Sequence, residues 1–465
     1  MTGSSPPELT VGQIYLLTPD GGNATRQEIP GIHLRAATGR AVNPRRPGSR
    51  TWRKIIGVRG APGRPAPNDG GGGYPERVSN VLPIHSHSPS VLEFFAGIGL
   101  ARVGLEQAGF RVAWSNDYEP DKWSLYAQNF PQDAVSGQHT YVVGDVGAVS
   151  GAELPRRTAL AWASSPCTDL SLAGNRRGLA GSQSGAFWHF IRLLEELGDD
   201  APGTVVLENV VGLATSNGGD DLTAAIRAFN DLGYSVDILM IDARRFVPQS
   251  RPRLFVVGAK NPPESVPGSN PELRPENLQG FFRDQTLTTH QAALPEAPAI
   301  LVEGFGEVAE SMPNDDPRWW DAERTERFVA SLSPVQLSRI TEMRASAGIK
   351  HRTAYRRTRH GQAVWEVRPD DISGCLRTAR GGSSKQAVVQ LGEGGLRVRW
   401  MTPREYARLM GAGDFDLSGT RDNQAFFAFG DAVAAPVVAW LSEHYLLPVV
   451  RGLRTAPRDA VAAHG

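Results

Sequence analysis

The sequence is poor in cysteine, in long apolar runs and in clustered metal ligands. Its 465 residues contain two cysteines, Cys167 and Cys375, which are too few for a disulfide scaffold and favour a reducing compartment. No apolar run approaches the roughly 20 residues of a membrane span, and the first residues lack the pattern of a signal peptide. The ten histidines show no ligand spacing, so we expect no metal site. We therefore predict a cytoplasmic protein without a membrane anchor.

Acidic residues are absent from one long stretch near the N-terminus. The whole chain is balanced, with 49 basic and 49 acidic residues, so its net charge neither supports nor excludes a nucleic-acid partner. Between Glu28 and Asp69, however, nine Lys or Arg residues occur without a single Asp or Glu. We predict that residues 1–88 form a basic, Pro/Gly-rich extension that is partly disordered, with one candidate strand at Val11–Leu17. It would either contact nucleic acid nonspecifically or stay a solvated tail.

From Ser90 onward, apolar runs alternate with amphipathic stretches. This rhythm predicts an α/β fold with a doubly wound, mostly parallel, Rossmann-like sheet. The expected strands are Val91–Phe95, Phe110–Trp114, Tyr141–Val143, Leu160–Ala163, Thr204–Leu207, Val236–Ile241 and Arg253–Gly258. The expected helices are Leu100–Gln107, Pro120–Phe130, Ala186–Leu197 and Leu222–Leu232.

The alternation ends near Lys260, which predicts a division into domains. Residues 89–260 would form the main domain, and residues 261–375, rich in Pro, Trp and charge, a smaller and irregular inserted one. Two further helices, Thr402–Met410 and Ala432–Tyr445, would return the chain to the main domain over residues 376–447. Residues 448–465 would be a tail.

One cysteine stands in a loop that should follow a buried strand. The run Leu160–Ala163 predicts the strand, and Ser164-Ser165-Pro166-Cys167 then ends it. Ligands bind beyond the carboxyl ends of strands in open α/β sheets, so a thiol held there beside a proline is placed to be a nucleophile. A buried structural cysteine is the competing interpretation of Cys167.

A glycine turn and two aspartates predict a site for an adenosine-containing cofactor. The turn Gly97-Ile98-Gly99 lies between a strand and a helix, where backbone N–H groups face an anionic group. The next glycine is Gly104, so the dinucleotide pattern G-x-G-x-x-G is not met, which argues against NAD. Asp117 and Asp145 end the next two strands and could accept hydrogen bonds from a ribose and an adenine. S-adenosylmethionine suits this set; a generic turn with two helix-capping aspartates is the alternative.

Charged side chains are expected beside the cysteine. Glu208 follows the strand next to that of Cys167, so both could face one cavity, where a carboxyl group can bind a ring nitrogen and an exocyclic amine together. Alternation places Arg251 and Arg253 on one face, and their guanidinium groups would favour a thiolate. A helix-capping glutamate and a solvated basic edge are the respective alternatives.

The order and spacing of these motifs resemble those of the DNA cytosine-C5 methyltransferases of the bacterial type. The resemblance spans residues 90–447 and is weak over 260–370. The matching motifs are Phe95–Gly99, Gly144-Asp145, Pro166-Cys167, Glu208-Asn209-Val210, Gln249–Arg253, Arg377-Thr378, Thr402–Glu405 and Gly430–Val433.

The resemblance implies methyl transfer from S-adenosylmethionine to C5 of a cytosine that is flipped out of duplex DNA. Cys167 would attack C6 as a thiolate, Glu208 would engage N3 and the 4-amino group, and Arg253 with Arg251 would hold O2. The residues implied to bind the cofactor are Phe95, Gly97, Ile98, Gly99, Asp117, Tyr118 and Asp145. Residues 261–375 would be the target-recognition domain, which reads bases in the major groove, and the basic run 350–360 would contact phosphates.

Three positions depart from the family's pattern. Leu100 stands where the family often has a further glycine, and Thr168 where a glutamine usually follows the cysteine. Asp431 replaces the usual asparagine after Gly430. The first two leave the implied mechanism intact, whereas the third puts the local hydrogen bonding at the domain junction in doubt.

Double-stranded DNA is the expected partner, and the chain is expected to be a monomer that associates with the bacterial nucleoid while it acts. A cognate restriction or defence-system protein stays open as a second partner. Three alternatives were weighed: a tRNA methyltransferase on the same fold, a catalytically silent DNA-binding relative and an NAD-dependent oxidoreductase. The size and charge pattern of 260–370 favours DNA over tRNA, and the presence of both Cys167 and Glu208 argues against a silent relative.

Overall fold

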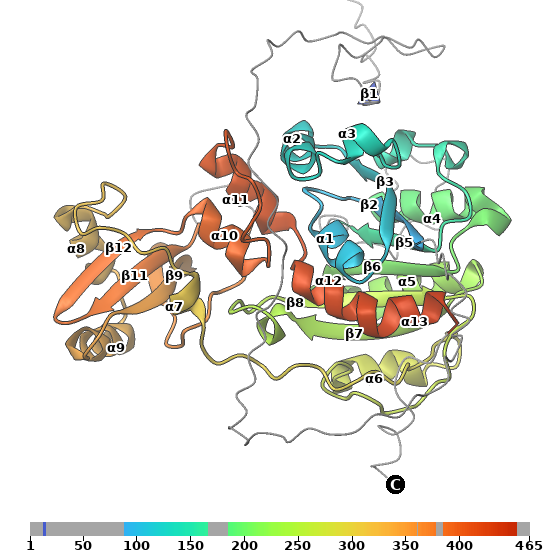
Figure 1. Cartoon of the computed structure of the whole chain (residues 1–465). Helices are drawn as coiled ribbons and strands as arrows, with labels where there is room; N and C mark the ends of the chain where they lie inside the picture. Colours follow the sequence, from blue (N-terminus) through green and yellow to red (C-terminus); the bar gives the residue numbers. More distant parts are fainter. Residues whose placement is uncertain (1–12, 15–87, 166–184, 360, 378–384, 453–465) are drawn as a thin grey trace, which may run out of the picture. The chain divides into compact units, whose positions relative to one another are not determined.

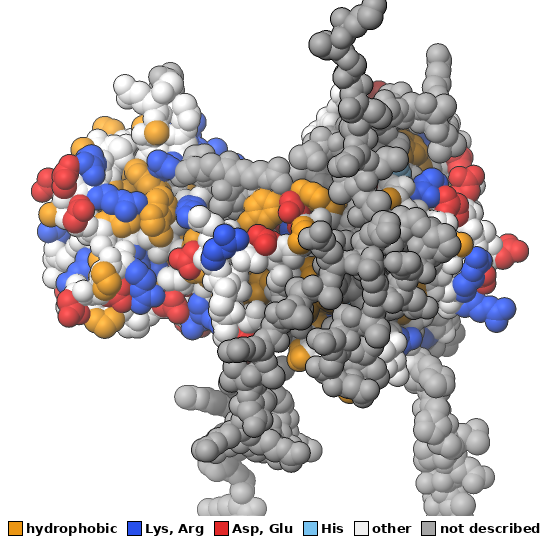
Figure 2. Space-filling model, turned by 90° about the horizontal axis from the view of Figure 1, so that it is seen from above, with side chains coloured by type: hydrophobic (Ala, Val, Ile, Leu, Met, Phe, Trp, Pro, Cys, Tyr) orange, Lys and Arg blue, Asp and Glu red, His pale blue; other side chains and the backbone are white. Residues whose placement is uncertain are grey.

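The computed structural model describes residues 13–14, 88–165, 185–359, 361–377 and 385–452 (Figure 1 and Figure 2). The loop that carries Cys167 and most of the predicted N-terminal extension lie outside these residues. Residues 13–14 form the short strand β1, within the predicted Val11–Leu17. The expectations for the rest of residues 1–88 and for the end of the chain therefore stay predictions.

A mixed sheet of eight strands forms the centre of the larger part of the described chain (Figure 1). The strands β2 to β6 run parallel, β8 lies antiparallel between β6 and β7, and β1 pairs antiparallel with β4. In sheet order they are β1 (Gln13–Ile14), β4 (Thr140–Val143), β3 (Arg111–Asp117), β2 (Ser90–Phe94), β5 (Leu160–Ser164), β6 (Thr204–Val210), β8 (Pro252–Ala259) and β7 (Ser235–Asp242). This confirms the α/β class and the seven strands predicted from Ser90 onward.

The strand order reverses between β2 and β5. From β2 the chain moves outward through β3 and β4, and it then restarts at β5 and moves the other way to β6. The carboxyl ends of β2 and β5 therefore flank a topological switch point, which is where ligands bind in open α/β sheets.

Alternating side chains of the sheet divide the core into two layers. On one face, Val91 and Trp162 pack in a cluster with residues of α1 and α12. On the other face, their neighbours Leu92 and Ala161 pack with residues of α4 and α5. Because side chains of a strand alternate between the two faces of its sheet, helices cover both faces, as in a doubly wound fold (Figure 1).

The helices agree with the sequence where glycines mark their ends. α1 and α4 have the predicted bounds, and α1 begins after Gly99, whose φ is 84°. α11 was not predicted, and α13 lies where the tail was expected to begin. The α-helices are α1 (Leu100–Gln107), α2 (Pro120–Asn129), α3 (Asp133–Ser136), α4 (Ala186–Leu197), α5 (Asp220–Asp231), α6 (Glu276–Arg283), α7 (Phe305–Val308), α8 (Ala322–Ala330), α9 (Pro334–Ala345), α10 (Pro403–Leu409), α11 (Asp422–Asp431), α12 (Ala435–Leu441) and α13 (Leu447–Val450).

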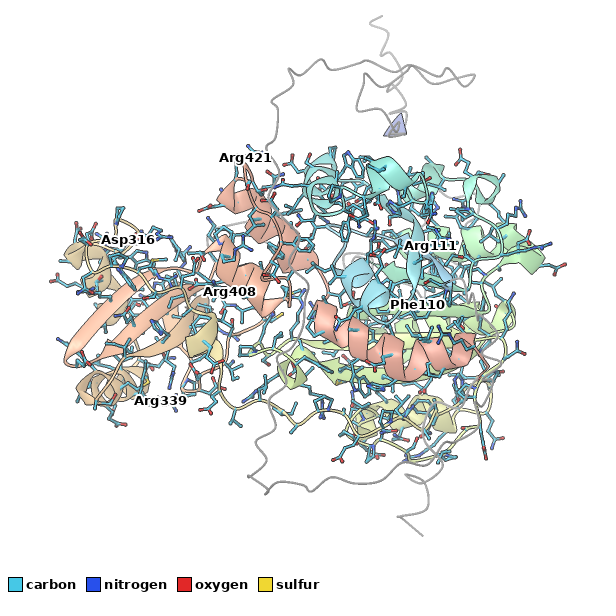
Figure 3. The ribbon with its side chains drawn as sticks, viewed as in Figure 1. Phe110, Arg111, Asp316, Arg339, Arg408 and Arg421 are labelled. Carbon is cyan, nitrogen blue, oxygen red and sulfur yellow. The ribbon has the colours of Figure 1, made fainter. Side chains whose placement is uncertain are left out.

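A second, antiparallel sheet of four strands lies in the C-terminal half of the chain. Its core contains Phe328 of α8 and Ile340 of α9, and Trp320, Trp365 and Trp400 pack against this core. Figure 3 labels Asp316 and Arg339 in this part of the chain. In sheet order the strands are β10 (Gln362–Val367), β9 (Lys350–Arg359), β11 (Ala387–Gly392) and β12 (Gly395–Trp400).

The predicted boundaries at 260/261 and 375/376 do not coincide with the limits of this second sheet. Residues beyond 260 still pack on the large sheet, where the buried Arg274 pairs with Asp237 of β7 at 2.5 Å. At the other end, β11 and β12 extend the small sheet to Trp400. The division of the chain into functional domains stays a proposal.

Two excursions of the chain build the small sheet. The first supplies β9 and β10 and closes where the Gly304 N–H group donates to Asp371 Oδ2 at 3.0 Å. The second supplies β11 and β12 and closes where Gln386 donates to the Gly374 carbonyl at 2.9 Å and Met401 N donates to Gln386 O at 3.0 Å. Pairing of β9 with β11 joins the two excursions.

Among the described residues, one helical stretch, interrupted at residues 432–434, is long and apolar enough to cross a membrane by length and composition. It runs from Asp422 to Val450, and 78% of its most apolar window is buried inside the protein. Its middle, α12, packs so closely on α1 that a Cβ atom at Gly104 would lie 2.6 Å from the Ala435 carbonyl oxygen. This burial is that of a core helix.

Candidate active site

The strand β5 ends at Ser164, three residues before Cys167. Cys167 and Thr168 lie outside the described residues, and Ser165 is the last described residue before them. Ser164 is paired in register with Glu208 of β6. Asn209 Nδ2 donates a hydrogen bond of 3.2 Å to the Ser165 carbonyl. Ser164 and Ser165, the last described residues before Cys167, are therefore fixed beside Glu208 and Asn209.

Glu208 and Arg253 form an ion pair between β6 and β8. Arg253 Nε lies 3.1 Å from Glu208 Oε1, and the two side chains are 15% and 7% exposed. A carboxylate this far removed from water needs a charged or hydrogen-bonded partner, and the guanidinium also fixes its orientation. The sequence predicts each of these residues beside Cys167 and does not pair them with each other, and their catalytic roles stay predictions.

Arg251 is turned toward the backbone of the C-terminal segment. It precedes β8, which begins at Pro252, and its guanidinium group donates to the carbonyls of Leu376 (2.8 Å), Gly430 (3.0 Å) and Ala432 (2.5 Å). Its Nη1 atom is also 3.5 Å from the sulfur of Cys375. Arg251 therefore joins residues that are far apart in sequence. The sequence predicts Arg251 and Arg253 on one face of the strand and does not predict these contacts.

Burial and the neighbouring Arg253 lower the pKa of Arg251 to about 10. Its guanidinium group therefore stays protonated at neutral pH, because that pKa is well above 7. The side chain is 1% exposed, so the carbonyl oxygens that it binds compensate for the loss of water.

The glycine turn after β2 is clamped from two neighbouring strands. Gly97 N donates to Asp117 Oδ2 at 2.9 Å, and Tyr141 of β4 donates to the Gly97 carbonyl at 2.9 Å. Phe95 and Gly99 have φ values of 57° and 84°, in the left-handed region. A Cβ atom at Gly99 would lie 2.5 Å from the Phe130 ring, so this position requires glycine.

The other residues expected at the cofactor side differ in exposure. Asp117 is 5% exposed and Tyr118 is 59% exposed at the end of β3. Asp145 is exposed and accepts a hydrogen bond from Gly147 N at 2.8 Å, which caps a short 3-10 helix. Ile98 packs in the hydrophobic core at 1% exposure, so only its backbone can face a ligand. Leu100 is also buried, at the start of α1.

Asp117 can accept a ribose in addition to its protein donors. Oδ2 receives Gly97 N, and Oδ1 receives Glu119 N at 3.0 Å. A carboxylate offers about four lone-pair sites, so about two remain for a pair of ribose hydroxyls. Burial raises the pKa of Asp117, and the nearby Lys122 opposes that rise.

A buried glutamate lies beneath this turn. Glu93 of β2 is 0% exposed; it accepts hydrogen bonds from Arg102 N (3.2 Å) and Ser115 Oγ (3.0 Å). Burial raises its pKa to about 8, against the opposing effects of Ser115 and Arg102. Glu93 is therefore largely protonated at neutral pH and supports the N-terminal turn of α1 as a neutral acid.

Sequence reasoning gave no role to Asn209, Tyr141 or Lys122. Asn209 stood inside a matching motif, so its position next to Glu208 was a usable signal. The contacts of Tyr141 with Gly97 and of Lys122 with Asp431 join residues that are far apart in sequence, whereas Lys122 and Asp117 are five residues apart. In the described part of the chain, no three His, Cys, Asp or Glu residues are grouped as metal ligands.

Known proteins resemble this chain in sequence and in fold. The family model for C-5 cytosine-specific DNA methylases matches residues 90–445. The type II methyltransferase M.NgoPII of Neisseria gonorrhoeae is 25% identical over 267 residues, which are 56% of this chain and 70% of that protein. The type II methyltransferase M.HhaI of Haemophilus parahaemolyticus is 23% identical over 352 residues, 76% of this chain and 92% of that protein.

Other relatives match over only about half of their own length. Among solved structures, the Dnmt2 methyltransferase of S. pombe superimposes with a TM-score of 0.51 and 17% identity. That match covers 78% of this chain and 99% of the other, and it supports the fold.

Proposed function

Because this chain belongs to the C-5 cytosine-specific DNA methylase family, we propose that it transfers a methyl group to C5 of cytosine in double-stranded DNA. The observation that carries the proposal is the Glu208–Arg253 ion pair beside the end of β5, whose chain continues to Cys167. The ion pair would supply the carboxyl group and the guanidinium group that the reaction needs close to the proposed nucleophile, Cys167.

The proposed reaction begins with covalent attack. The Cys167 thiolate forms an S–C6 bond, and the electron pair of the C5–C6 double bond becomes a nucleophile at C5. Glu208 hydrogen-bonds N3 and the 4-amino group, and Arg253 binds O2, so the charge that develops on the ring is stabilised. After methylation a base removes the C5 proton, and breaking the S–C6 bond restores the double bond and releases the thiolate.

The methyl donor implied by the family is S-adenosylmethionine, which supplies an electrophilic methyl group when bound. The turn at Gly97 and the free acceptor sites of Asp117 suit an adenosine that carries no pyrophosphate. Asp117 would hold the ribose, exposed Tyr118 would stack on the adenine, and Asp145 would accept from its amino group. Phe95, Gly97, Ile98 and Gly99 would border the methionine end through the turn.

Arg251 would act on the site as a positioning residue. Its fork is occupied by three backbone carbonyls, so contact with O2 of cytosine falls to Arg253. Arg251 holds residues 430–432 against the base side of the site, by which we mean the part around Glu208 and Arg253. This assignment narrows the earlier expectation that both arginines hold the base.

The β9–β10 hairpin of the small sheet would contact the DNA backbone. Arg357 and Arg359 are exposed and share one acid, Glu366, at 3.0 and 2.6 Å. Two arginines against one glutamate leave a net positive charge for phosphates. The small sheet and residues 261–375 would together form the target-recognition domain.

A single labelling experiment tests the activity. Purified full-length protein is incubated with S-adenosylmethionine labelled in its methyl group, in the presence of duplex DNA or tRNA, beside a Cys167→Ala variant. We expect label in DNA and none with the variant. Label in tRNA alone would replace the proposal by the tRNA alternative, and label that persists in the variant would contradict the covalent mechanism.

Trapping and sequencing experiments sharpen this test. Duplex DNA that carries 5-fluorocytosine should form a stable adduct, because the C5 substituent cannot leave as a proton. Bisulfite sequencing of DNA from expressing cells should give the target site. We further propose a monomeric, cytoplasmic enzyme of restriction–modification or related phage defence; co-purification of a nuclease encoded nearby would support that role, and host DNA without modified sites would oppose it.

A further inference from the structure

Lys122 lies between two carboxylates that come from different parts of the chain. Its Nζ atom is 3.6 Å from Oδ2 of Asp117, at the end of β3, and 3.4 Å from Oδ2 of Asp431, at the end of α11. The Lys122 side chain is 11% exposed, and its ammonium group lies 5.6 Å from the centroid of the Phe427 ring. One cation is therefore shared between the candidate ribose acceptor and the C-terminal helix.

The backbone on both sides of Asp431 is held by a residue of the base side. Arg251 donates to the carbonyls of Gly430 and Ala432 at 3.0 and 2.5 Å. These contacts fix the chain around Asp431 independently of the cofactor side. The Asp431 carboxylate can therefore act as a fixed anchor for the flexible Lys122 side chain.

The distance from Lys122 to Asp117 suits an electrostatic role. At 3.6 Å the ammonium group lies outside hydrogen-bond range, so it leaves the remaining lone pairs of Asp117 available. It is still close enough to favour the charged form of a carboxylate that is 5% exposed. An asparagine at position 431, usual in the family, would offer Lys122 no charge.

We propose that Lys122, anchored by Asp431, is a positioning residue that keeps Asp117 charged and free to accept the ribose hydroxyls of the cofactor. The proposal rests on the proposed function, because it assumes that Asp117 binds that ribose. It gives the departure at Asp431 a role: the aspartate adds an ion pair between the cofactor side and the C-terminal helix.

The role predicts a change in pH dependence. The charged or titratable groups that face Asp117 are Lys122, Glu119 and Tyr141. Burial raises the pKa of Asp117, and of these groups Lys122 opposes the rise. Without Lys122 the pKa would rise further, so Asp117 would take up a proton at a higher pH and lose acceptor sites. As pH is lowered, the affinity of Lys122→Met for the cofactor should therefore begin to fall at a higher pH than the affinity of the wild type.

Calorimetric titration of the full chain with S-adenosylmethionine and with S-adenosylhomocysteine, from pH 5 to 8, tests the proposal. We expect Lys122→Met to weaken binding roughly ten-fold and Asp431→Asn roughly three-fold. The double variant should bind no more weakly than Lys122→Met, because Asp431 acts through Lys122. Lys122→Arg should keep most of the affinity.

Arg421→Ala is the matched control. Arg421 pairs with Asp121 at 3.5 Å, which joins α2 to the start of α11 without touching Asp117, and both side chains are largely exposed. Figure 3 shows Arg421 at that end of α11. This variant should bind the cofactor like the wild type, which separates the role of Lys122 from general docking of the two helices.

The outcomes distinguish this inference from the proposed function. Additive effects of the two substitutions, or an unchanged pH profile in Lys122→Met, would overturn the role of Lys122. Failure of the wild-type chain to bind either compound would instead contradict the proposed function. Thermal unfolding of each variant is measured in parallel, and if Lys122→Met does not fold, the isosteric Asp431→Asn decides alone: unchanged affinity overturns the proposal.

Discussion

The two sides of the candidate active site are held by different kinds of contact. On the cofactor side, Asp117 and Tyr141 fix the Gly97 turn through hydrogen bonds that stay within β2, β3 and β4. On the base side, Arg251 binds carbonyls more than a hundred residues further along the chain, at Leu376 and Gly430. The glycine turn is therefore held by neighbouring strands, and the cofactor side reaches the C-terminal segment through the Lys122–Asp431 pair. The contacts of Arg251, in contrast, form only when that segment has docked.

This difference predicts separable consequences of mutation. A change on the cofactor side should alter cofactor affinity with little effect on folding. A change on the base side should either stop the chemistry, if it touches Glu208, or loosen the C-terminal segment, if it touches Arg251. The predictions below test that separation.

The largest effect is expected for Glu208→Gln. The amide cannot supply the acid's proton or balance Arg253, so we expect kcat to fall roughly 10³-fold with an unchanged dissociation constant for the cofactor. Steady-state methyl transfer and calorimetry measure the two quantities. Glu303→Gln, at an exposed position, is the control. A matching loss of cofactor affinity would show that the two sides are not separable.

Arg251→Met should destabilise the fold by about 3 kcal/mol. It leaves three carbonyl oxygens without their donor, and unsatisfied buried groups cost about 1–3 kcal/mol each. Urea unfolding measures the change. Arg245→Met is the comparison, because Arg245 is half-buried and donates to the Pro298 carbonyl at 2.7 Å. Equal stability losses in the two variants would remove the special role given to Arg251.

Glu93→Gln should change how stability depends on pH. The pKa of Glu93 is raised from 4.5 to about 8, so between these values the native state keeps a proton that the unfolded state has lost. The wild type should therefore lose about 3–4 kcal/mol of stability from this group as pH rises from about 5 to 8. The glutamine variant should lack that slope. Parallel stability curves for the two proteins would contradict a neutral Glu93.

Asp117→Asn should weaken cofactor binding roughly ten-fold, because the amide retains one acceptor oxygen and turns N–H groups toward the other partners. Since the glycine turn is also held by Tyr141, the thermal midpoint should change little. Calorimetry and thermal unfolding give both values. Normal affinity in this variant would move the ribose site away from Asp117.

The strands of the large sheet could be predicted from the sequence, whereas the four strands of the small sheet could not. The bounds of α1 and α4 were correct because glycines and apolar periodicity are local signals. β9 carries mostly basic residues, and what makes it a strand is its pairing with β10 and β11, where Arg357 meets Glu366 and Arg356 lies over Trp365. Such cross-strand partners cannot be identified from one strand alone.

The candidate site shows the same limit. Glu208 and Asp117 lie at the carboxyl ends of β6 and β3, so the rule about carboxyl ends could place them. Arg253 lies at the start of β8, which is antiparallel to β6, and only that pairing brings it beside Glu208. The acceptors of Arg251 are backbone carbonyls, which every residue carries, so no residue pattern could single them out. The pairing of Lys122 with Asp431 depends on the docking of α11, a helix that was not predicted.

The two excursions that build the small sheet have a consequence for protein engineering. Each closes on itself, at Gly304 with Asp371 and at Gln386 with Met401, so either could be exchanged without lengthening the chain. The two excursions are joined by the antiparallel pairing of β9 with β11, which consists of five residue pairs from Ala387↔Ala354 to Leu391↔Lys350. A chimera that imports one excursion from a relative must match this pairing in register, and one that imports both carries the pairing with it.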